Sequence, residues 1–480
     1  MVSVCFYFQV HQPFRLRKYQ VFDIGRNHDY FDEAKNRQIA EKVANKCYLP
    51  ANRIILDLIK NTKGRFRCAY SITGVALEQF ERYTPEVIES FKELAKTGCV
   101  EFLSETYYHS LSYIYSKEDF RRQVEMHKDK IKKLFSQTPT VFRNTELVFN
   151  NELANYVEGM GYKGIIAEGA DHILGWRSPN FLYRAVTTKK IKVLLKNYKL
   201  SDDIAFRFSN KGWEEWPLTS EKFAQWVNSA NGNGEVLNLF MDYETLGEHQ
   251  WEDTGIFDFL KQLPWEILRH PDNDFVTPTE AIKRYDVRGE VDMHSFVSWA
   301  DIERDLSAWI GNSMQKNALK ELYQLESDVL STGESKLIED WRKLQTSDHF
   351  YYMCTKWFAD GDVHRYFNPY DSPYDSFIAF MNILNDIVFR IRDIEPSACS
   401  GPKQKEADYN ARKRAGRDYG ENTAKDAGKD DDTSKYDGKD DDAGSYDSKT
   451  RAKATLSATG QGKGFLISET PSRLLAEKKR

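Results

Sequence analysis

The chain has 480 residues, of which 40% are hydrophobic and 29% are charged, and its formal net charge is −5 at pH 7. These values predict a soluble protein with a large core. The mildly negative charge argues against nucleic acid or an anionic membrane surface as a partner. No apolar run reaches the length of a membrane span, so no transmembrane segment is expected.

The six cysteines are scattered through the chain and form no C-x-x-C pair. Neither a zinc site with paired cysteines nor a disulfide framework is therefore predicted. The N-terminus has no basic leader and no small-residue cleavage site. Together, free thiols and the lack of a leader indicate a protein of the cytoplasm.

Short apolar runs alternate with amphipathic stretches up to about residue 285. This alternation predicts βα units around a mainly parallel sheet, and polar residues at the carboxyl ends of successive strands favour a barrel or a barrel-like sheet. We expect strands at 2–10, 66–72, 99–103, 140–142, 164–167 and 236–241, and helices at 33–61, 84–96, 117–135 and 150–160.

The pattern changes from about residue 286 onward. The segment 286–397 is dominated by amphipathic stretches with helical spacing, which predict a helical subdomain packed on the unit 1–285. These stretches are 303–330, 333–345 and 374–394.

Residues 398–480 differ in composition from the rest of the chain. They are rich in Lys, Asp, Gly and Ser and carry a near repeat around two Gly-Lys-Asp-Asp-Asp runs. Too little apolar surface is present to offset the ordering entropy, so a disordered charged tail is predicted. A calcium loop is a weaker alternative, because the acids lack the ligand pattern of an EF-hand.

Polar residues next to three of the apolar runs are candidates for chemistry. His11 follows the first run, where a satisfied structural histidine and a ligand-facing turn are both compatible with its position. Glu101 lies inside a run, where a buried carboxylate needs a partner, so a structural hydrogen bond is the alternative to a ligand contact. Glu146 follows a strand and precedes a helix, which it could simply cap.

The segment that follows the apolar run 236–241 is the most informative part of the sequence. Asp242, Glu244, Glu248 and His249 occur there within eight residues. A buried strand rarely ends in so many charges unless they bind something or do chemistry. In α/β folds the carboxyl ends of the strands face the ligand.

Two carboxylates at neighbouring strand ends are the equipment of glycoside hydrolysis, one as nucleophile or base and the other as acid. Metal binding competes with this interpretation, because His11, Asp242 and His249 could be ligands. No H-x-E or H-E-x-x-H motif supports the metal alternative.

The chain resembles glycoside hydrolase family 57, and most closely the α-amylase branch of that family. The resemblance covers roughly residues 1–395. The motifs that carry it are His11-Gln12-Pro13, Glu101 in GCVEFLSETYYHSL, Glu146 in FRNTELVF, Asp242 in FMDYETLGEH, Asp348 in TSDHFYYM, and SWADIERDLSAWIGNSMQ at 298–315.

The resemblance implies an α/β fold, an incomplete (β/α)7 barrel followed by a helical bundle that completes the active-site cleft. It implies retaining hydrolysis of α-1,4-glucosidic bonds in starch- or glycogen-type glucans, with Glu146 as nucleophile and Asp242 as acid/base. No cofactor or metal is implied, and the partner is an α-glucan or a maltooligosaccharide. The positions that match sugar-binding residues of the family are His11, Glu101, Arg177, Trp299 and Asp348.

This mechanism needs Asp242 to carry a proton before the glycosidic bond breaks. We expect like-charge repulsion from Glu244, Glu248 and Glu146 to raise the pKa of Asp242.

Three alternatives stay open at this point. A 4-α-glucanotransferase of the same family would use the same two acids, with a sugar hydroxyl in place of water. A metal-dependent enzyme resembling polysaccharide deacetylases would use His11 and Asp242 as ligands. A carbohydrate-binding protein without turnover is the third, and the intact pair of acids argues against it.

Overall fold

The computed structural model describes residues 2–356 and 368–394. These residues lie within one compact unit, on both sides of the boundary predicted at 285/286, and the division into 1–285 and 286–397 stays a prediction. The predicted tail, 398–480, lies outside the described residues. None of the helices in the described ranges is both long enough and apolar enough to cross a membrane.

Two five-stranded sheets form the centre of the described part of the chain. The first has the order β3-β2-β1-β8, with β9 also paired to β1, and the second has the order β10-β6-β7-β5-β4. All these pairs are parallel except β6 with β7. The strands are Ser3–Val10 (β1), Cys68–Ile72 (β2), Val100–Phe102 (β3), Val141–Arg143 (β4), Gly164–Glu168 (β5), Leu182–Ala185 (β6), Lys192–Lys196 (β7), Val236–Asp242 (β8), Asp274–Phe275 (β9) and Val287–Val291 (β10).

Strand β1 is buried on both faces along its whole length. Phe6 and Phe8 point to the core under the helices, whereas Cys5 and Tyr7 point to an interior cluster that also contains side chains of β5 and β7. Parallel strands covered on both sides read as continuous apolar runs, which explains why the sequence predicted this strand.

The two sheets touch at two places. Next to β3, the amide N–H of Ser104 donates to Val141 O (3.0 Å) and that of Arg143 donates to Ser104 O (2.8 Å). Next to β7, the amide N–H of Asn197 donates to the carbonyl oxygen of Asn238 in β8 (2.9 Å). Both sheets therefore send their carboxyl ends toward a common region.

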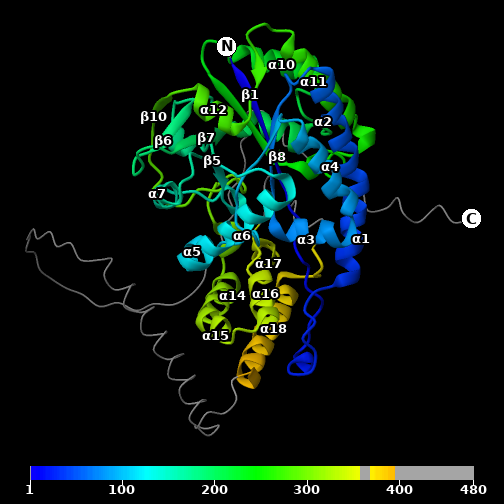
Figure 1. The fold of residues 1–480 in the computed structure, drawn as a ribbon, viewed down its shortest axis with the longest axis vertical. Helices are drawn as coiled ribbons and strands as arrows, with labels where there is room; N and C mark the ends of the chain where they lie inside the picture. Colours follow the sequence, from blue (N-terminus) through cyan, green and yellow to red (C-terminus); the bar gives the residue numbers. More distant parts are fainter. Residues whose placement is uncertain (1, 357–367, 395–480) are drawn as a thin grey trace, which may run out of the picture. The chain divides into compact units, whose positions relative to one another are not determined.

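Helices cover the outer faces of both sheets (Figure 1). One core lies between the first sheet and α2, α4, α10 and α11, and another lies between the second sheet and α6 and α7. The helices up to residue 285 are Glu33–Val43 (α1), Leu49–Asn61 (α2), Gly74–Tyr83 (α3), Pro85–Lys96 (α4), Ser112–Tyr115 (α5), Lys117–Phe135 (α6), Asn151–Gly159 (α7), Asp171–Leu174 (α8), Tyr198–Asp202 (α9), Ser220–Ser229 (α10), Ile256–Leu268 (α11) and Pro278–Arg284 (α12).

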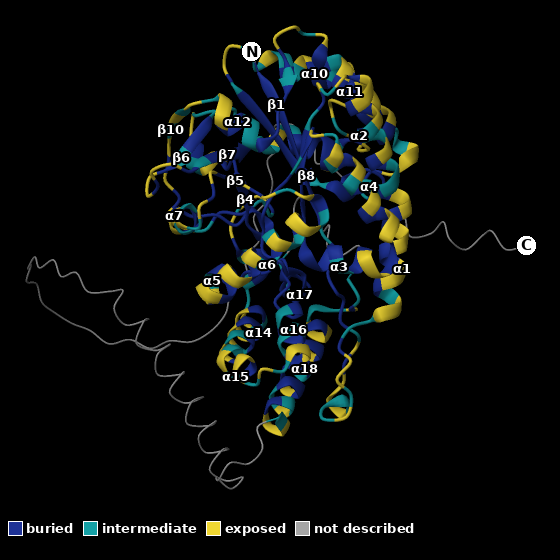
Figure 2. Cartoon of the chain, viewed as in Figure 1, coloured by how far each residue is buried: buried dark blue, intermediate teal, exposed yellow. Residues whose placement is uncertain are grey.

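The segment after β10 is helical and has its own apolar core, which includes Trp309, Trp341 and Phe380. Figure 2 shows buried residues along the inner faces of these helices and exposed residues on their outer faces. The helices are Ser307–Ile310 (α13), Ser313–Gln324 (α14), Glu326–Ser331 (α15), Ser335–Lys343 (α16), Ser347–Tyr351 (α17) and Pro373–Ile394 (α18).

A loop from the N-terminal part of the chain packs on α18, where it runs beside that helix (Figure 1). The carboxylate of the buried Asp386 accepts hydrogen bonds from Tyr30 Oη and from the amide N–H of Gly25 (2.6 Å), and it pairs with His28 Nδ1 (2.7 Å). This contact ties residues 16–31 to the last described helix.

Most of the predicted elements are present in the structure. The predicted helix 33–61 consists of α1 and α2 joined by a π-helical turn at Ala44–Tyr48, and α4 begins at Pro85 as expected. The predicted ranges did not include the strands β6, β7, β9 and β10 or the helices α3, α5, α8, α9, α10, α11, α12 and α17.

Candidate active site

A cavity opens where the carboxyl ends of β1, β4 and β8 converge. It encloses about 1190 Å³ including its open mouth. Five residues predicted from the sequence line it, namely His11, Glu146, Asp242, Trp299 and Asp348. The other described side chains that bring polar atoms to its wall include Gln9, Gln12, Arg15, His109, Lys196, Asp202, Glu244, Thr245, His249 and Asp301.

Glu146 lies on a short 3-10 turn directly after β4. Its backbone φ is +56°, and Leu147 beside it also has a positive φ of +53°. Two consecutive non-glycine residues in the left-handed region store strain, which persists only where the surroundings enforce it and which gathers at functional sites. Here the amide N–H of Trp299 donates to the carbonyl oxygen of Glu146 (3.2 Å) and helps to hold the turn.

The carboxylate of Glu146 is buried and accepts hydrogen bonds on both oxygens. Trp299 Nε1 donates to Oε2 (2.7 Å), His109 Nε2 lies 3.0 Å from Oε1, and Ser347 Oγ donates to Oε1 (3.3 Å). Donors from three distant parts of the chain fix the side chain in one orientation.

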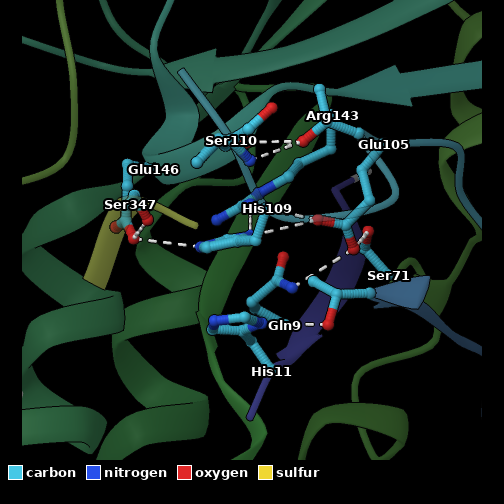
Figure 3. Close-up of polar contacts among 12 residues, drawn as sticks. Gln9, His11, Ser71, Glu105, His109, Ser110, Arg143, Glu146 and Ser347 are labelled. Atoms are coloured by element: carbon cyan, nitrogen blue, oxygen red, sulfur yellow. Dashed lines mark hydrogen bonds and ion pairs between the residues drawn. The ribbon is translucent and has the colours of Figure 1, made fainter. Parts of the chain in front are cut away.

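His109 lies between two carboxylates, as Figure 3 shows. Its Nδ1 is 3.3 Å from Glu105 Oε2 and its Nε2 is 3.0 Å from Glu146 Oε1. Burial is the largest single influence and lowers the pKa of His109, but the hydrogen bonds to Glu105 and Glu146 outweigh it and raise that pKa above its ordinary value. The raised pKa extends the pH range over which the ring is an imidazolium, the form that donates from both nitrogens.

Glu105 is the ionised carboxylate on the Nδ1 side of His109. Burial alone would raise its pKa, but the hydrogen bond from His109 and the charge of Arg143 lower it to about 2. Ser71 Oγ and Gln9 Nε2 donate to its other oxygen. Sequence reasoning missed both Glu105 and His109, although they lie in the same motif as Glu101.

His11 stacks on His109, with ring centroids 3.9 Å apart. Its Nδ1 is 2.9 Å from Thr73 Oγ1 and its Nε2 is 2.9 Å from Asp348 Oδ2. Burial, followed by the neighbouring His109, lowers the pKa of His11 to about 4. His11 is thus a neutral ring at neutral pH, next to one that favours its charged form.

Trp299 faces cations as well as Glu146. Arg143 Cζ lies 5.2 Å and Lys196 Nζ lies 5.3 Å from the centroid of its ring. Arg143 Nε and Nη2 are buried and have no hydrogen-bond partner among the described residues. The contact of the Arg143 guanidinium with the π face of Trp299 offsets part of the free-energy cost of burying these nitrogens. The same contact helps to fix the indole ring that donates to Glu146.

The charges of Glu244 and Glu248, in the segment after β8, differ from those that the prediction assumed. Burial and then the charge of Asp242 raise the pKa of Glu244 to about 8, so Glu244 is mostly protonated at neutral pH. Glu248 is fully buried and pairs with Lys42. Glu244 and Glu248 therefore do not both carry the free negative charge that the prediction assumed, and a raised pKa of Asp242 stays a prediction.

Glu101 does not line the cavity, and the predicted sugar contact is a misplacement. Its two oxygens accept from the amide N–H of Thr279 (2.8 Å) and from Thr279 Oγ1 (2.5 Å), at the start of α12. Glu101 lies in the middle of β3, whereas the cavity forms beyond the ends of the strands. The structural hydrogen bond left open by the sequence is the arrangement observed.

Arg177 is also absent from the described lining of the cavity. Its guanidinium donates to three backbone oxygens, those of Leu174 (3.1 Å), Ile173 (2.8 Å) and Glu290 (2.5 Å). It joins the loop after α8 to β10 and has no part in the cavity wall.

Ligand atoms of His11, His109 and Asp348 all lie within 4.8 Å of one another, a spacing that a metal ion could bridge. Asp242 and His249, which the metal alternative invoked, do not belong to this group of described residues. Every ring nitrogen of the two histidines has a hydrogen-bond partner. The same atoms thus form a complete hydrogen-bonded network.

Comparisons with known proteins give a consistent result. The family whose sequence model matches residues 5–294 is described as Glycosyl hydrolase family 57. A protein of Methanocaldococcus jannaschii with the name "Putative alpha-amylase" is 43% identical over 407 residues, which are 82% of this chain and 85% of that protein.

Solved structures of low sequence identity share the fold. The α-amylase AmyC from Thermotoga maritima has a TM-score of 0.54 and 13% identity, over 82% of this chain and 96% of that one. The 4-α-glucanotransferase from Thermococcus litoralis has a TM-score of 0.54 and 18% identity, over 73% of this chain. The chain spans 56% of the length of that transferase.

Proposed function

The chain belongs to glycosyl hydrolase family 57 and is a glycoside hydrolase, and from this premise we propose that it is a retaining α-amylase that cleaves α-1,4-glucosidic bonds in α-glucans. The observation that carries the proposal is the environment of Glu146. This buried carboxylate lines the same cavity as Asp242 and accepts hydrogen bonds on both oxygens.

In the first step, an oxygen of Glu146 bonds to the anomeric carbon while the glycosidic C–O bond breaks and Asp242 gives its proton to the leaving oxygen. In the second step, Asp242 takes a proton from water, the water oxygen bonds to the anomeric carbon, and the ester to Glu146 breaks. Each displacement inverts the anomeric carbon once, so its configuration is retained.

The hydrogen bonds to Glu146 support its role as the nucleophile. The donors Trp299 and His109 stabilise the ionised carboxylate, and the protein supplies them before the substrate arrives.

We infer that the two sheets together form the incomplete (β/α)7 barrel that the resemblance implied. The order β1-β2-β3-β4-β5-β7-β8 closes on itself if the contacts at Ser104 and Asn197 count as pairings. The helices α13 to α18 would then act as the bundle at the cleft, because Ser347 and Asp348 of α17 reach Glu146 and His11.

A 4-α-glucanotransferase is the second candidate, because the transferase from Thermococcus litoralis shares the fold. Both reactions use the same two acids and differ in whether water or a sugar hydroxyl takes the glucosyl unit. Incubation with maltotriose separates them. Products longer than the substrate indicate transfer, and shorter products alone indicate hydrolysis.

The central test replaces each acid with its amide. Glu146→Gln and Asp242→Asn should each lower kcat on a maltooligosaccharide by roughly 10³-fold or more, with circular dichroism and Tm close to those of the parent protein. NMR of the first products should show the α-anomer. Near-normal activity in either folded variant, or a β-anomer as first product, contradicts the proposal.

A further inference from the structure

A second groove lies between α2 and α11. It is lined by residues of both helices and by the segment that follows β8. The described residues that line it are Asn45, Lys46, Pro50, Arg53, Ile54, Asp57, Gly247, Trp251, Glu252, Asp253, Phe257, Asp258 and Lys261. None of them lines the cavity that holds Glu146 and Asp242.

Trp251 is the one aromatic side chain of this groove that is largely exposed, with 49% of its surface accessible. Its backbone is held in place, because its carbonyl oxygen accepts from the amide N–H (3.0 Å) and from Oγ1 (2.6 Å) of Thr254. The preceding residue, Gln250, is buried and donates to Ala205 O (2.8 Å). A fixed backbone thus presents a large, half-exposed ring, and Lys46 Nζ lies over the ring, 5.1 Å from its centroid.

The groove and the cavity share a wall. Thr245 and His249 of the segment after β8 line the cavity, whereas Gly247 and Trp251 of the same segment line the groove. Gly247 packs so closely on Lys46 O that a side chain there would collide with it. The backbone of this segment therefore packs directly on the backbone of Lys46, and the segment contributes residues to both depressions.

The polar lining of the groove suits a neutral, hydroxyl-rich ligand. Three cationic and four anionic side chains line it, so the groove has no strong field of one sign that would select nucleic acid or a phosphate. Arg53 and Asp57 are exposed and form no hydrogen bond or ion pair within the described residues. Both remain available to exchange hydrogen bonds with sugar hydroxyls.

From these observations we propose that the groove is a second glucan-binding site, in which Trp251 stacks on a glucose ring of a long α-glucan chain whose other part enters the cavity. The proposal rests on the proposed function, since the ligand is the same polymer. An amphipathic ring on a rigid turn, surrounded by a few polar groups, gives stacking area at low entropic cost.

The test compares Trp251→Ala with Trp265→Ala. Trp265 on α11 is 45% exposed and does not occur in the described lining of the groove or the cavity, so it is a matched control. Retention of each variant is measured in native gels that contain amylopectin, and kcat/KM is measured on amylose and on maltotetraose.

We expect Trp251→Ala to weaken retention by amylopectin and to lower kcat/KM on amylose by about fivefold. Its kcat/KM on maltotetraose should stay within about twofold of the parent value, and Trp265→Ala should match the parent throughout. Trp251→Phe keeps a ring and should restore most of the retention.

Unchanged retention of Trp251→Ala overturns the second site, and so does an equal loss on amylose and maltotetraose. If the parent protein turns over maltotetraose and Trp251→Ala gives either of these results, the second site is excluded and the proposed function stands. A parent protein that neither turns over maltotetraose nor binds amylopectin contradicts both.

Discussion

Two stacked histidines in the cavity have opposite protonation preferences for reasons that can be read from their partners. His11 meets one carboxylate and one hydroxyl, and burial lowers its pKa to about 4. His109 meets a carboxylate at each nitrogen, so its pKa is raised despite equal burial. A charged ring beside a neutral ring avoids the repulsion that two imidazolium ions would feel at this distance.

At the residue scale, His109 should set the alkaline limit of activity. Because its pKa is raised, the imidazolium is present below that pKa and is lost as the pH rises through it, and Glu146 then loses a charged donor. The kcat/KM profile should fall above the ordinary histidine range of about 6.5. His109→Asn should lower kcat by roughly 10–100-fold at pH 6 and remove this alkaline limb.

Asparagine is the suitable replacement because His109 has a φ of +53°, a conformation that Asn tolerates better than most residues. Full pH profiles of kcat/KM for both proteins, with Tm as the control for folding, make the measurement. An unchanged alkaline limb in the variant excludes His109 as its source.

At the element scale, the sequence predicted the elements whose environment is uniform. β1 and β8 are buried on both faces and therefore read as apolar runs. β7 begins and ends in lysines, β10 is half exposed, and β6 has an arginine in its four residues, so none of these has an apolar or an alternating pattern long enough to recognise.

The same reasoning explains the outcome for the candidate site. Glu146 and Asp242 were found because they directly follow strands, and the ends of strands meet at one edge of the fold. Glu101 and Glu105 lie four residues apart in one motif. The position at which β3 ends decides which of the two lies within the strand and which lies beyond its carboxyl end. Boundaries of short strands are the least predictable feature of a sequence, so the choice between them fell on the wrong residue.

Glu101 should therefore act on stability and leave catalysis unchanged. Glu101→Ala removes the acceptor of the Thr279 N–H in a half-buried place, whereas the Thr279 hydroxyl keeps Thr140 Oγ1 (2.8 Å) as a partner. The change should therefore cost about 0.5–1.5 kcal/mol in the free energy of unfolding. Glu101→Gln can accept from the N–H and contact the hydroxyl, so it should restore most of this loss. Urea unfolding gives the free energies, and kcat/KM of both variants should stay within about twofold of the parent value. A tenfold loss of kcat/KM in Glu101→Gln would instead return this residue to the sugar site.

At the scale of the whole molecule, the cavity depends on contacts between the first and last parts of the described chain. Asp386 on α18 holds the loop at Gly25, His28 and Tyr30, and His11 and Asp348 meet across the cavity wall. A substitution that breaks the contact between Asp386 and the loop should therefore also destabilise the cavity wall at His11 and Asp348.

Asp386→Ala should destabilise the protein by roughly 2–4 kcal/mol, because it removes a buried charged acceptor from several donors. Asp393 is exposed on the same helix, and Asp393→Ala should change stability by no more than about 0.5 kcal/mol. Thermal scans measure both effects, and activity should fall with the same midpoint as the unfolding of Asp386→Ala. Equal Tm values for the two variants would show that the contact has no structural importance.

The hydrogen bond between His11 and Asp348 spans 337 positions of sequence. Such a contact has a high loop-closure cost and forms only after the intervening elements have taken their places. During synthesis, the chain therefore cannot complete the cavity wall until residue 348 has left the ribosome. In a refolding experiment, the recovery of activity should lag behind the recovery of secondary structure, and the length of that lag measures how slowly the last helices dock.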